Sequence, residues 1–218
     1  MLRARVFKVF SPTRSTNMNE GYIKFECEWV KQKIHVPDHT FISLEKSRTK
    51  LHQLALIGMY PDGIGFGNIS VRSEHSGFYI TGSATGQFSS LKTEHYAEVL
   101  SYNFAQNKLT CIGQTKASAE SLTHAAIYEA LPDAKAVVHI HSLSLWEKLL
   151  NIFPTTAPEI EYGTPEMAEA VFSAAKKLRP ANDKIIVMGG HKEGILSFGS
   201  NLDEATNQIL KIYNQFSK

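Results

Sequence analysis

The sequence predicts an α/β fold in which helices cover a sheet that contains hairpins. Residues 67–72 and 77–81 have the composition of two strands joined by a polar turn. Residues 97–113 form a second such hairpin, with polar turn residues near its centre. Two further apolar strands are predicted at 184–189 and 194–199. Hairpins mixed with helices argue against a simple parallel α/β sheet.

Two helices are predicted in the first part of the chain. Residues 41–60 carry apolar side chains at helical spacing, and Pro61 ends this pattern. Residues 118–133 form the second helix, because Ser118 is a suitable N-cap and Pro132 a suitable stop.

Two more helices follow in the last third of the sequence. Thr164 is the expected cap of a helix over residues 164–178, with Pro165 in the first helical position. The last helix begins after Ser200 or Asn201, either of which can act as its cap. Its apolar residues fall on one face: Leu202, Ala205, Ile209, Ile212 and Phe216.

Composition and charge exclude several classes of function. Of the 218 residues, 43% are hydrophobic and 20% charged, which suits one globular domain, and no flexible spacer separates a second one. Lys and Arg outnumber Asp and Glu by only 23 to 21, so the charge favours neither nucleic acid nor an anionic membrane as a partner. No apolar run approaches the roughly 20 residues of a membrane-spanning helix. Two cysteines, Cys27 and Cys111, are too few for a disulfide scaffold and favour a reducing compartment, the cytoplasm.

The N-terminal 40 residues differ in character from the rest of the chain. Residues 1–19 are basic and contain no acidic residue, a composition also found in organellar transit peptides. We expect residues 1–40 to form an ordered arm instead. Its apolar side chains must be buried on its own subunit or on a neighbour's. They include Phe7, Val9, Phe10, Tyr22, Phe25 and Trp29.

A pair of histidines is the first candidate for chemistry. His139 and His141 lie one residue apart on a predicted strand, where residues i and i+2 point to the same side. Two imidazoles that converge in this way can bind zinc and leave room for other ligands. Two ordinary polar side chains on an exposed face are the alternative, which a lone His-x-His pattern favours.

Two further residues extend the pattern. His191 lies between two predicted strands in a segment where Gly189, Gly190 and Gly194 can let the backbone approach a metal or substrate closely. A glycine turn with an incidental histidine is the alternative. Glu120 falls in the first turn of the 118–133 helix, where an acid can simply complement the helix dipole.

Five blocks of sequence resemble, in the same order, those of the class II aldolase/adducin superfamily. The resemblance spans residues 45–213 and is most specific in the third block, where the acid, the helix, the Pro-Asp turn and the His-x-His strand fall in register. The blocks are GFGNISVR, YITGSATG, ASAESLTHAAIYEALPDAKAVVHIHS, GGHKEGILSFG and SNLDEA. The resemblance implies a three-layer α/β/α fold with a central, largely antiparallel mixed sheet, in a single domain over residues 41–218.

The resemblance also implies a metal site. By it, His139, His141 and His191 are the metal ligands, and Glu120 is the acid/base, which can also bind the metal before substrate arrives. Three histidines with an open position match a catalytic zinc site. Iron, cobalt, nickel or manganese also suit this set of ligands.

The activity implied is that of a metal-dependent lyase. A divalent metal can hold the oxygens of a ketose and stabilise an enediolate, so we expect aldol cleavage of a short sugar phosphate with Glu120 moving the proton. The ribulose-phosphate 4-epimerase and the methylthioribulose-phosphate dehydratase of the family use the same ligands, so both reactions remain alternatives. An adducin-like binding or assembly role is a third, which the presence of all three histidines and Glu120 disfavours.

The family binds phosphate through backbone amides and small hydroxyls in three loops. The matching residues are Gly67 and Asn68 in the first loop, Thr85 and Gly86 in the second, and Ser118 in the third. A tight entry of the backbone into a strand is an alternative explanation for the glycine at position 67.

The sequence departs from the family pattern in each of these loops. Gly65 stands where sugar-phosphate aldolases often have threonine, and Ala119 replaces a common serine. YITGSATG lacks the usual proline and has an extra residue, so Ser83 competes with Thr85 for the hydroxyl role. HKEGILSFG is longer than the usual loop by two residues. An unphosphorylated or differently anchored substrate is therefore a rival to a sugar phosphate.

Members of this superfamily commonly form cyclic tetramers with active sites at subunit junctions, so we expect a homotetramer. The arm can take part in that interface or pack over its own sheet, and composition does not decide between the two.

Overall fold

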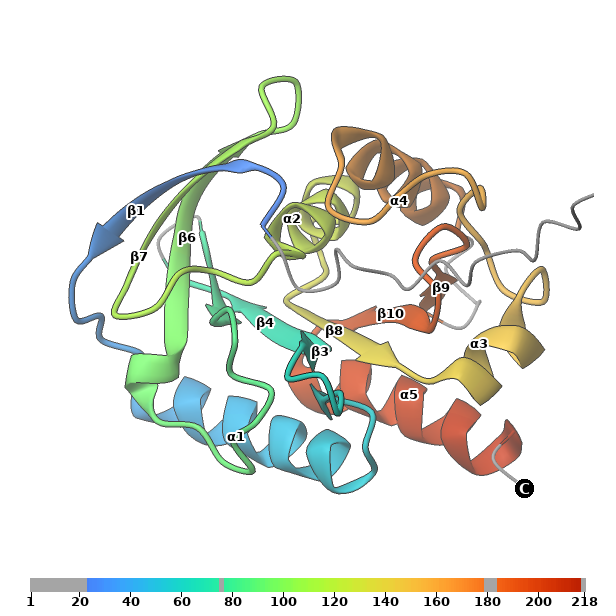
Figure 1. Ribbon diagram of the computed structural model, residues 1–218, viewed down its shortest axis with the longest axis horizontal. Helices are drawn as coiled ribbons and strands as arrows, with labels where there is room; N and C mark the ends of the chain where they lie inside the picture. Colours follow the sequence, from blue (N-terminus) through green and yellow to red (C-terminus); the bar gives the residue numbers. More distant parts are fainter. Residues whose placement is uncertain (1–22, 75–76, 179–183, 217–218) are drawn as a thin grey trace, which may run out of the picture.

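An eight-stranded sheet forms the middle of the molecule, in the order β1-β7-β6-β5-β4-β8-β10-β9. The computed structural model describes residues 23–74, 77–178 and 184–216. Neighbouring strands are antiparallel except β1 and β7, which are parallel. Helices α2 and α4 cover one face of the sheet, and α1, α3 and α5 cover the other (Figure 1). The predicted three-layer α/β/α arrangement with a mixed, largely antiparallel sheet is confirmed.

The elements have the following bounds. The strands of the main sheet are β1 (Glu26–Lys31), β4 (Asn68–Arg72), β5 (Phe78–Thr81), β6 (Tyr96–Asn103), β7 (Lys108–Gly113), β8 (Ala136–His141), β9 (Ile185–Val187) and β10 (Gly194–Gly199). A separate two-stranded ribbon consists of β2 (Gly58–Met59) and β3 (Gly65–Phe66). The helices are α1 (Asp38–Gln53), α2 (Ser121–Ala130), α3 (Leu143–Leu149), α4 (Pro165–Lys177) and α5 (Leu202–Phe216), with a short 3₁₀ turn η1 (Thr93–His95).

Several local predictions are confirmed. The β6–β7 hairpin turns at residues 104–107, where Asn107 has a φ of 49°. The Thr164 hydroxyl accepts a hydrogen bond from the Met167 amide at 3.2 Å and so caps α4. The side chain of Asn201 accepts one from the Glu204 amide at 2.8 Å and caps α5. Two residues of the predicted turn between β4 and β5, 75–76, lie outside the described residues.

The bounds of two predicted helices were wrong. α1 runs from Asp38 to Gln53 rather than over 41–60, because the chain leaves the helix at Ala55, whose φ is 53°, and enters the β2–β3 ribbon. α2 starts at Ser121, and its cap position is held by Glu120 rather than by Ser118. The Ser118 hydroxyl accepts a hydrogen bond from the Glu120 amide at 3.3 Å, within the turn that precedes the helix.

The described part of the N-terminal arm packs on its own subunit. β1 extends the sheet at the edge next to β7, Phe25 is 5% exposed, and the Trp29 indole donates a hydrogen bond to the Gly113 carbonyl at 2.9 Å. The earlier apolar residues Phe7, Val9, Phe10 and Tyr22, like the basic segment 1–19, lie outside the described residues. An interface role for them, and the homotetramer itself, stay predictions.

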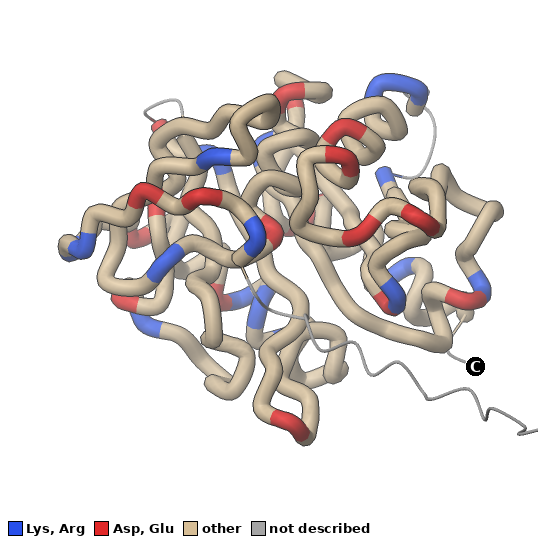
Figure 2. Tube along the Cα trace, turned by 45° about the horizontal axis from the view of Figure 1, so that its top comes forward, with Lys and Arg blue, Asp and Glu red and all other residues tan. Residues whose placement is uncertain are grey.

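Charged residues of both signs are interspersed along the chain (Figure 2). Among the residues coloured in Figure 2, basic and acidic positions do not separate into two regions of opposite sign. None of the helices in the described ranges is both long and apolar enough to cross a membrane.

A polar network is buried between the sheet and α2. The Ser70 hydroxyl lies 2.7 Å from His124 Nδ1 and 2.8 Å from the Tyr128 hydroxyl. His124 is fully buried, and the cost of desolvating its charged form lowers the pKa of this imidazole from 6.5 to about 3. The ring is therefore neutral in the folded protein at neutral pH.

Burial of neutral His124 should make the protein less stable as the pH falls from about 6.5 toward 3. The unfolded chain binds a proton on this residue in that window and the folded chain does not, so the free energy of unfolding falls by about 1.4 kcal/mol per pH unit on its account. Urea denaturation between pH 4.5 and 7.5 should give a shallower slope for His124→Gln than for the parent protein. Equal slopes would show that His124 does not contribute.

Candidate metal centre

Strand β8 places His139 and His141 on one face of the sheet. Val138 and Ile140, which alternate with them, pack in the core on the side of α1 and α5, so the histidines point toward the α2 side. The register sets His139 between Asn68 of β4 and Leu196 of β10, and sets His141 opposite Gly194. A central strand therefore holds both imidazoles on a rigid support.

His191, in the turn between β9 and β10, joins this pair. The three histidines each offer a ring nitrogen, and these nitrogens all lie within 4.8 Å of one another. His139, His141 and His191 are 1%, 3% and 3% exposed as whole residues. Sequence-distant histidines are thus brought into one cluster, whose role as metal ligands stays a prediction.

The chemistry of the cluster fits a divalent cation. Burial, followed by the neighbouring imidazoles, lowers the pKa of His139 and His141 well below 6.5, which keeps the rings in the neutral form that binds metals. His139 Nε2 is buried and has no hydrogen-bond partner among the described residues. A metal ion would satisfy such a nitrogen, which is otherwise costly to bury.

Asn68 lies behind His139. Its side-chain nitrogen Nδ2 lies 3.3 Å from His139 Nδ1. If His139 Nε2 binds a metal, Nδ1 carries the proton and needs an acceptor, and exchanging the nitrogen and oxygen positions of the Asn68 amide would supply one. Asn68, expected as a substrate residue, is therefore also placed to orient a ligand.

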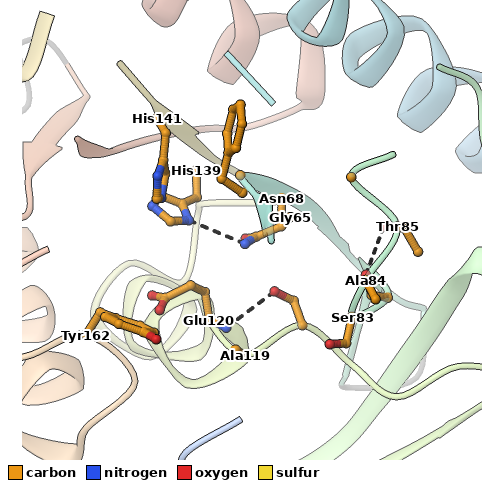
Figure 3. A pocket seen from close by; sticks show the side chains of 15 residues that line it. Gly65, Asn68, Ser83, Ala84, Thr85, Ala119, Glu120, His139, His141 and Tyr162 are labelled. Atoms are coloured by element: carbon orange, nitrogen blue, oxygen red, sulfur yellow. Dashed lines mark hydrogen bonds between the residues drawn. The ribbon is translucent and has the colours of Figure 1, made fainter. Parts of the chain in front are cut away.

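Glu120 lies at the start of α2 and is 4% exposed. Its carboxylate points into the same space as His139 and His141 (Figure 3). The Thr123 hydroxyl donates a hydrogen bond to Glu120 Oε2 at 2.7 Å, which fixes the orientation of the carboxylate. An acid that served only the helix dipole would be exposed to solvent, so this geometry favours a role in the pocket.

All five predicted substrate residues line one pocket together with Glu120, His139 and His141 (Figure 3). These residues are Gly67, Asn68, Thr85, Gly86 and Ser118. The Thr85 hydroxyl donates to the Gly82 carbonyl at 2.8 Å, so its proton is already used within its own loop. Ser83, Ala84 and Gly65 also line the pocket, which keeps Ser83 as the alternative hydroxyl.

Helix α1 anchors the second of these loops, which sequence reasoning missed. Arg48 is 1% exposed and donates to the carbonyls of Thr85 and Ser89 at 3.1 and 3.2 Å. Glu45 accepts hydrogen bonds from the Leu91 amide and the Tyr96 hydroxyl, each at 2.7 Å. A charged pair on the inner face of a helix, three residues apart, was the available signal.

Tyr162 is a further pocket residue that the sequence did not point to. It lines the pocket, and its ring stacks on that of His191 with centroids 4.5 Å apart. It comes from the segment before α4, which no predicted element contains, so no periodic pattern could have singled it out.

The glycines around His191 have another purpose than the one expected. A Cβ on Gly189 or Gly190 would lie 2.1 Å from the Thr156 carbonyl oxygen or 1.9 Å from that of Ile160. These two glycines therefore admit a neighbouring backbone segment rather than a metal or substrate. Gly67 has a φ of 71° and its Cβ would meet Ile57 at 2.8 Å, so a tight strand entry explains it.

Comparisons with known proteins point to one family. The family described as Class II Aldolase and Adducin N-terminal domain matches residues 62–216. A 3-oxo-tetronate 4-phosphate decarboxylase of Haemophilus influenzae is 30% identical over 165 residues, which are 66% of this chain and 71% of the relative.

Solved structures share the fold. The L-fuculose-1-phosphate aldolase of Thermus thermophilus has a TM-score of 0.60 at 21% identity, over 81% of this chain and 90% of that one. A sugar-phosphate aldolase of Thermotoga maritima has a TM-score of 0.60 at 17% identity, over 82% and 92% of the two chains.

Proposed function

This chain belongs to the class II aldolase and adducin family, and we propose that it is a metal-dependent lyase that breaks a carbon–carbon bond in a short sugar phosphate. One observation supports the proposal above the others. Three buried histidine nitrogens lie within 4.8 Å of one another, beside a pocket that also holds the carboxylate of Glu120. A purely structural or adducin-like role gives no reason to bury an acid next to three imidazoles.

His139, His141 and His191 would hold the metal, with zinc as the expected ion. When bound, a divalent cation supplies a Lewis acid for a substrate carbonyl and its neighbouring hydroxyl. In aldol cleavage, Glu120 would accept the proton of the substrate hydroxyl, and the carbon that bears this hydroxyl would become the aldehyde. The electron pair of the broken bond moves toward the carbonyl, and Glu120 then returns the proton to the carbon left behind.

The loops of the pocket would bind the phosphate. The pocket lining formed by the described residues contains no lysine or arginine, so backbone amides and hydroxyls are the donors available. Ala84 has a φ of 59° between Ser83 and Thr85, a conformation that can turn successive amides toward an anion. Ser118 would add its hydroxyl proton, since its oxygen accepts from the Glu120 amide.

Decarboxylation is the second candidate reaction. The decarboxylase of Haemophilus influenzae, at 30% identity, supports it. Loss of carbon dioxide from a 3-oxo acid leaves the same electron pair beside a carbonyl, so the same ligands can serve it. Glu120 would then act only as the proton donor to carbon.

A substrate panel separates the candidates. Protein purified without added metal is first analysed for its metal content. It is then assayed with L-fuculose 1-phosphate, other ketose 1-phosphates and 3-oxo-tetronate 4-phosphate, with aldehyde, carbon dioxide, epimer and dehydrated product measured separately. Aldehyde release supports aldol cleavage and carbon dioxide supports the second candidate. Protein that binds one metal ion yet releases neither from any substrate would contradict the proposed lyase.

A further inference from the structure

Two polar side chains from different loops meet behind His141. The Tyr60 hydroxyl lies 2.8 Å from His141 Nδ1 and donates a hydrogen bond to Glu193 Oε2 at 2.8 Å. Tyr60 comes from the turn between β2 and β3, and Glu193 from the turn between β9 and β10. The three residues therefore form a continuous chain from a carboxylate through a phenol to an imidazole.

Tyr60 and Glu193 lie outside the pocket that holds Glu120. Tyr60 and Glu193 line a separate cavity of about 520 Å³, and neither of them lines the pocket that holds Glu120 and the substrate loops. His141 lines both. Tyr60 and Glu193 are thus placed to act on the imidazole and not on a substrate.

The hydrogen bonds determine which nitrogen of His141 carries the proton. A phenol has one hydroxyl proton, and Tyr60 gives it to Glu193. The short contact to His141 must then be a hydrogen bond from Nδ1–H to the phenol oxygen. In this tautomer Nε2 carries a lone pair, which is the form needed to bind a metal.

Both partners are held in place by their surroundings. The Tyr60 ring packs on Phe66 with centroids 4.4 Å apart, and Phe66 stacks on His141 at 5.6 Å. The Glu193 carbonyl accepts a hydrogen bond from the Ser142 amide at 3.0 Å. Glu193 has a φ of 75°, a conformation that is costly for a residue other than glycine and that is often found where function requires it.

We propose that Tyr60 and Glu193 are positioning residues of the metal centre, which fix the tautomer and orientation of His141 and strengthen it as a ligand. The inference rests on the proposed metal site but not on which bond the enzyme breaks. A carboxylate hydrogen-bonded to a ligand histidine makes that ligand more basic, and here the phenol carries the interaction from one to the other.

Zinc affinity, measured by competition with a chromophoric chelator, tests the proposal. Tyr60→Phe removes the acceptor of Nδ1–H and should weaken zinc binding by about 10–100-fold. Glu193→Gln keeps an acceptor for the phenol but removes the charge, so its affinity should lie between that of Tyr60→Phe and the parent. Tyr213→Phe and Lys192→Gln are matched controls. The first removes a phenol hydroxyl from the same cavity and the second a charge from the same turn.

A double variant tests whether Glu193 acts on His141 through the Tyr60 phenol or independently of it. Without the phenol, Glu193 no longer acts on His141, so Tyr60→Phe/Glu193→Gln should bind zinc no more weakly than Tyr60→Phe. The visible spectrum of cobalt-loaded Tyr60→Phe should also shift. If Tyr60→Phe fails to fold, Glu193→Gln still tests the proposal, because Glu193 lies in a partly exposed turn.

Two results would contradict the proposal that Glu193 acts on His141 through Tyr60. One is that both single variants bind zinc within about twofold of the parent, and the other is that their losses simply add. A parent protein that binds no zinc, cobalt or other divalent metal would instead overturn the metal centre of the proposed function.

Discussion

Replacing Glu120 by glutamine is expected to lower kcat by about 10²–10⁴-fold, because the amide cannot move the proton. Glu120 is 4% exposed and lines the pocket of His139 and His141, so the loss should appear in kcat more than in KM. Bound metal should stay near the parent level, since three histidines remain as ligands. Steady-state kinetics on the best substrate of the panel and metal analysis of the same sample measure both effects.

Glu166 provides the matched control for this variant. It is an exposed acid in the first turn of α4, outside the pocket, so Glu166→Gln removes the same kind of helix-dipole interaction without touching the chemistry. If Glu120→Gln were as active as Glu166→Gln, Glu120 would be a helix-dipole acid and not the acid/base.

Local signals in the sequence located most of the elements. Thr164 with Pro165, Asn201, and the turn before Lys108 mark element ends through contacts between residues a few positions apart. The His-x-His spacing gave the shared face of β8 for the same reason, because alternation along a strand is a local property. Such features can be read from the sequence without knowledge of the tertiary fold.

Features that depend on distant contacts could not be predicted in this way. The pairing of β1 with β7 is one such feature: Cys27 and Trp29 alternate with Glu26 and Glu28 as in a strand, but this local pattern does not select β7 as the partner. Tyr60 and Glu193 are separated by 133 positions, and only the packing of two turns against β8 brings them to His141. The start of α2 was misplaced because Ser118 caps a turn before the helix, and this same turn moves Glu120 to the pocket.

Replacing His139 by glutamine should have the second large effect, the loss of the metal itself. Loss of a partner behind a ligand costs about 10–100-fold in affinity, so loss of a ligand should cost more than about 100-fold. Activity should fall to background and should not return when zinc is added. The zinc-dependent rise in Tm that the parent shows should also disappear, because a ligand stabilises the folded state only in proportion to its binding.

His124 gives the control that makes this result specific to the metal. It is equally buried on the same side of the sheet, but it lies outside the cluster of three. His124→Gln should therefore keep both the metal and the zinc-dependent rise in Tm. Undiminished zinc content in His139→Gln would place the metal elsewhere. Loss of metal in His139→Gln together with its retention in Glu120→Gln would separate the residues that hold the ion from the one that moves the proton.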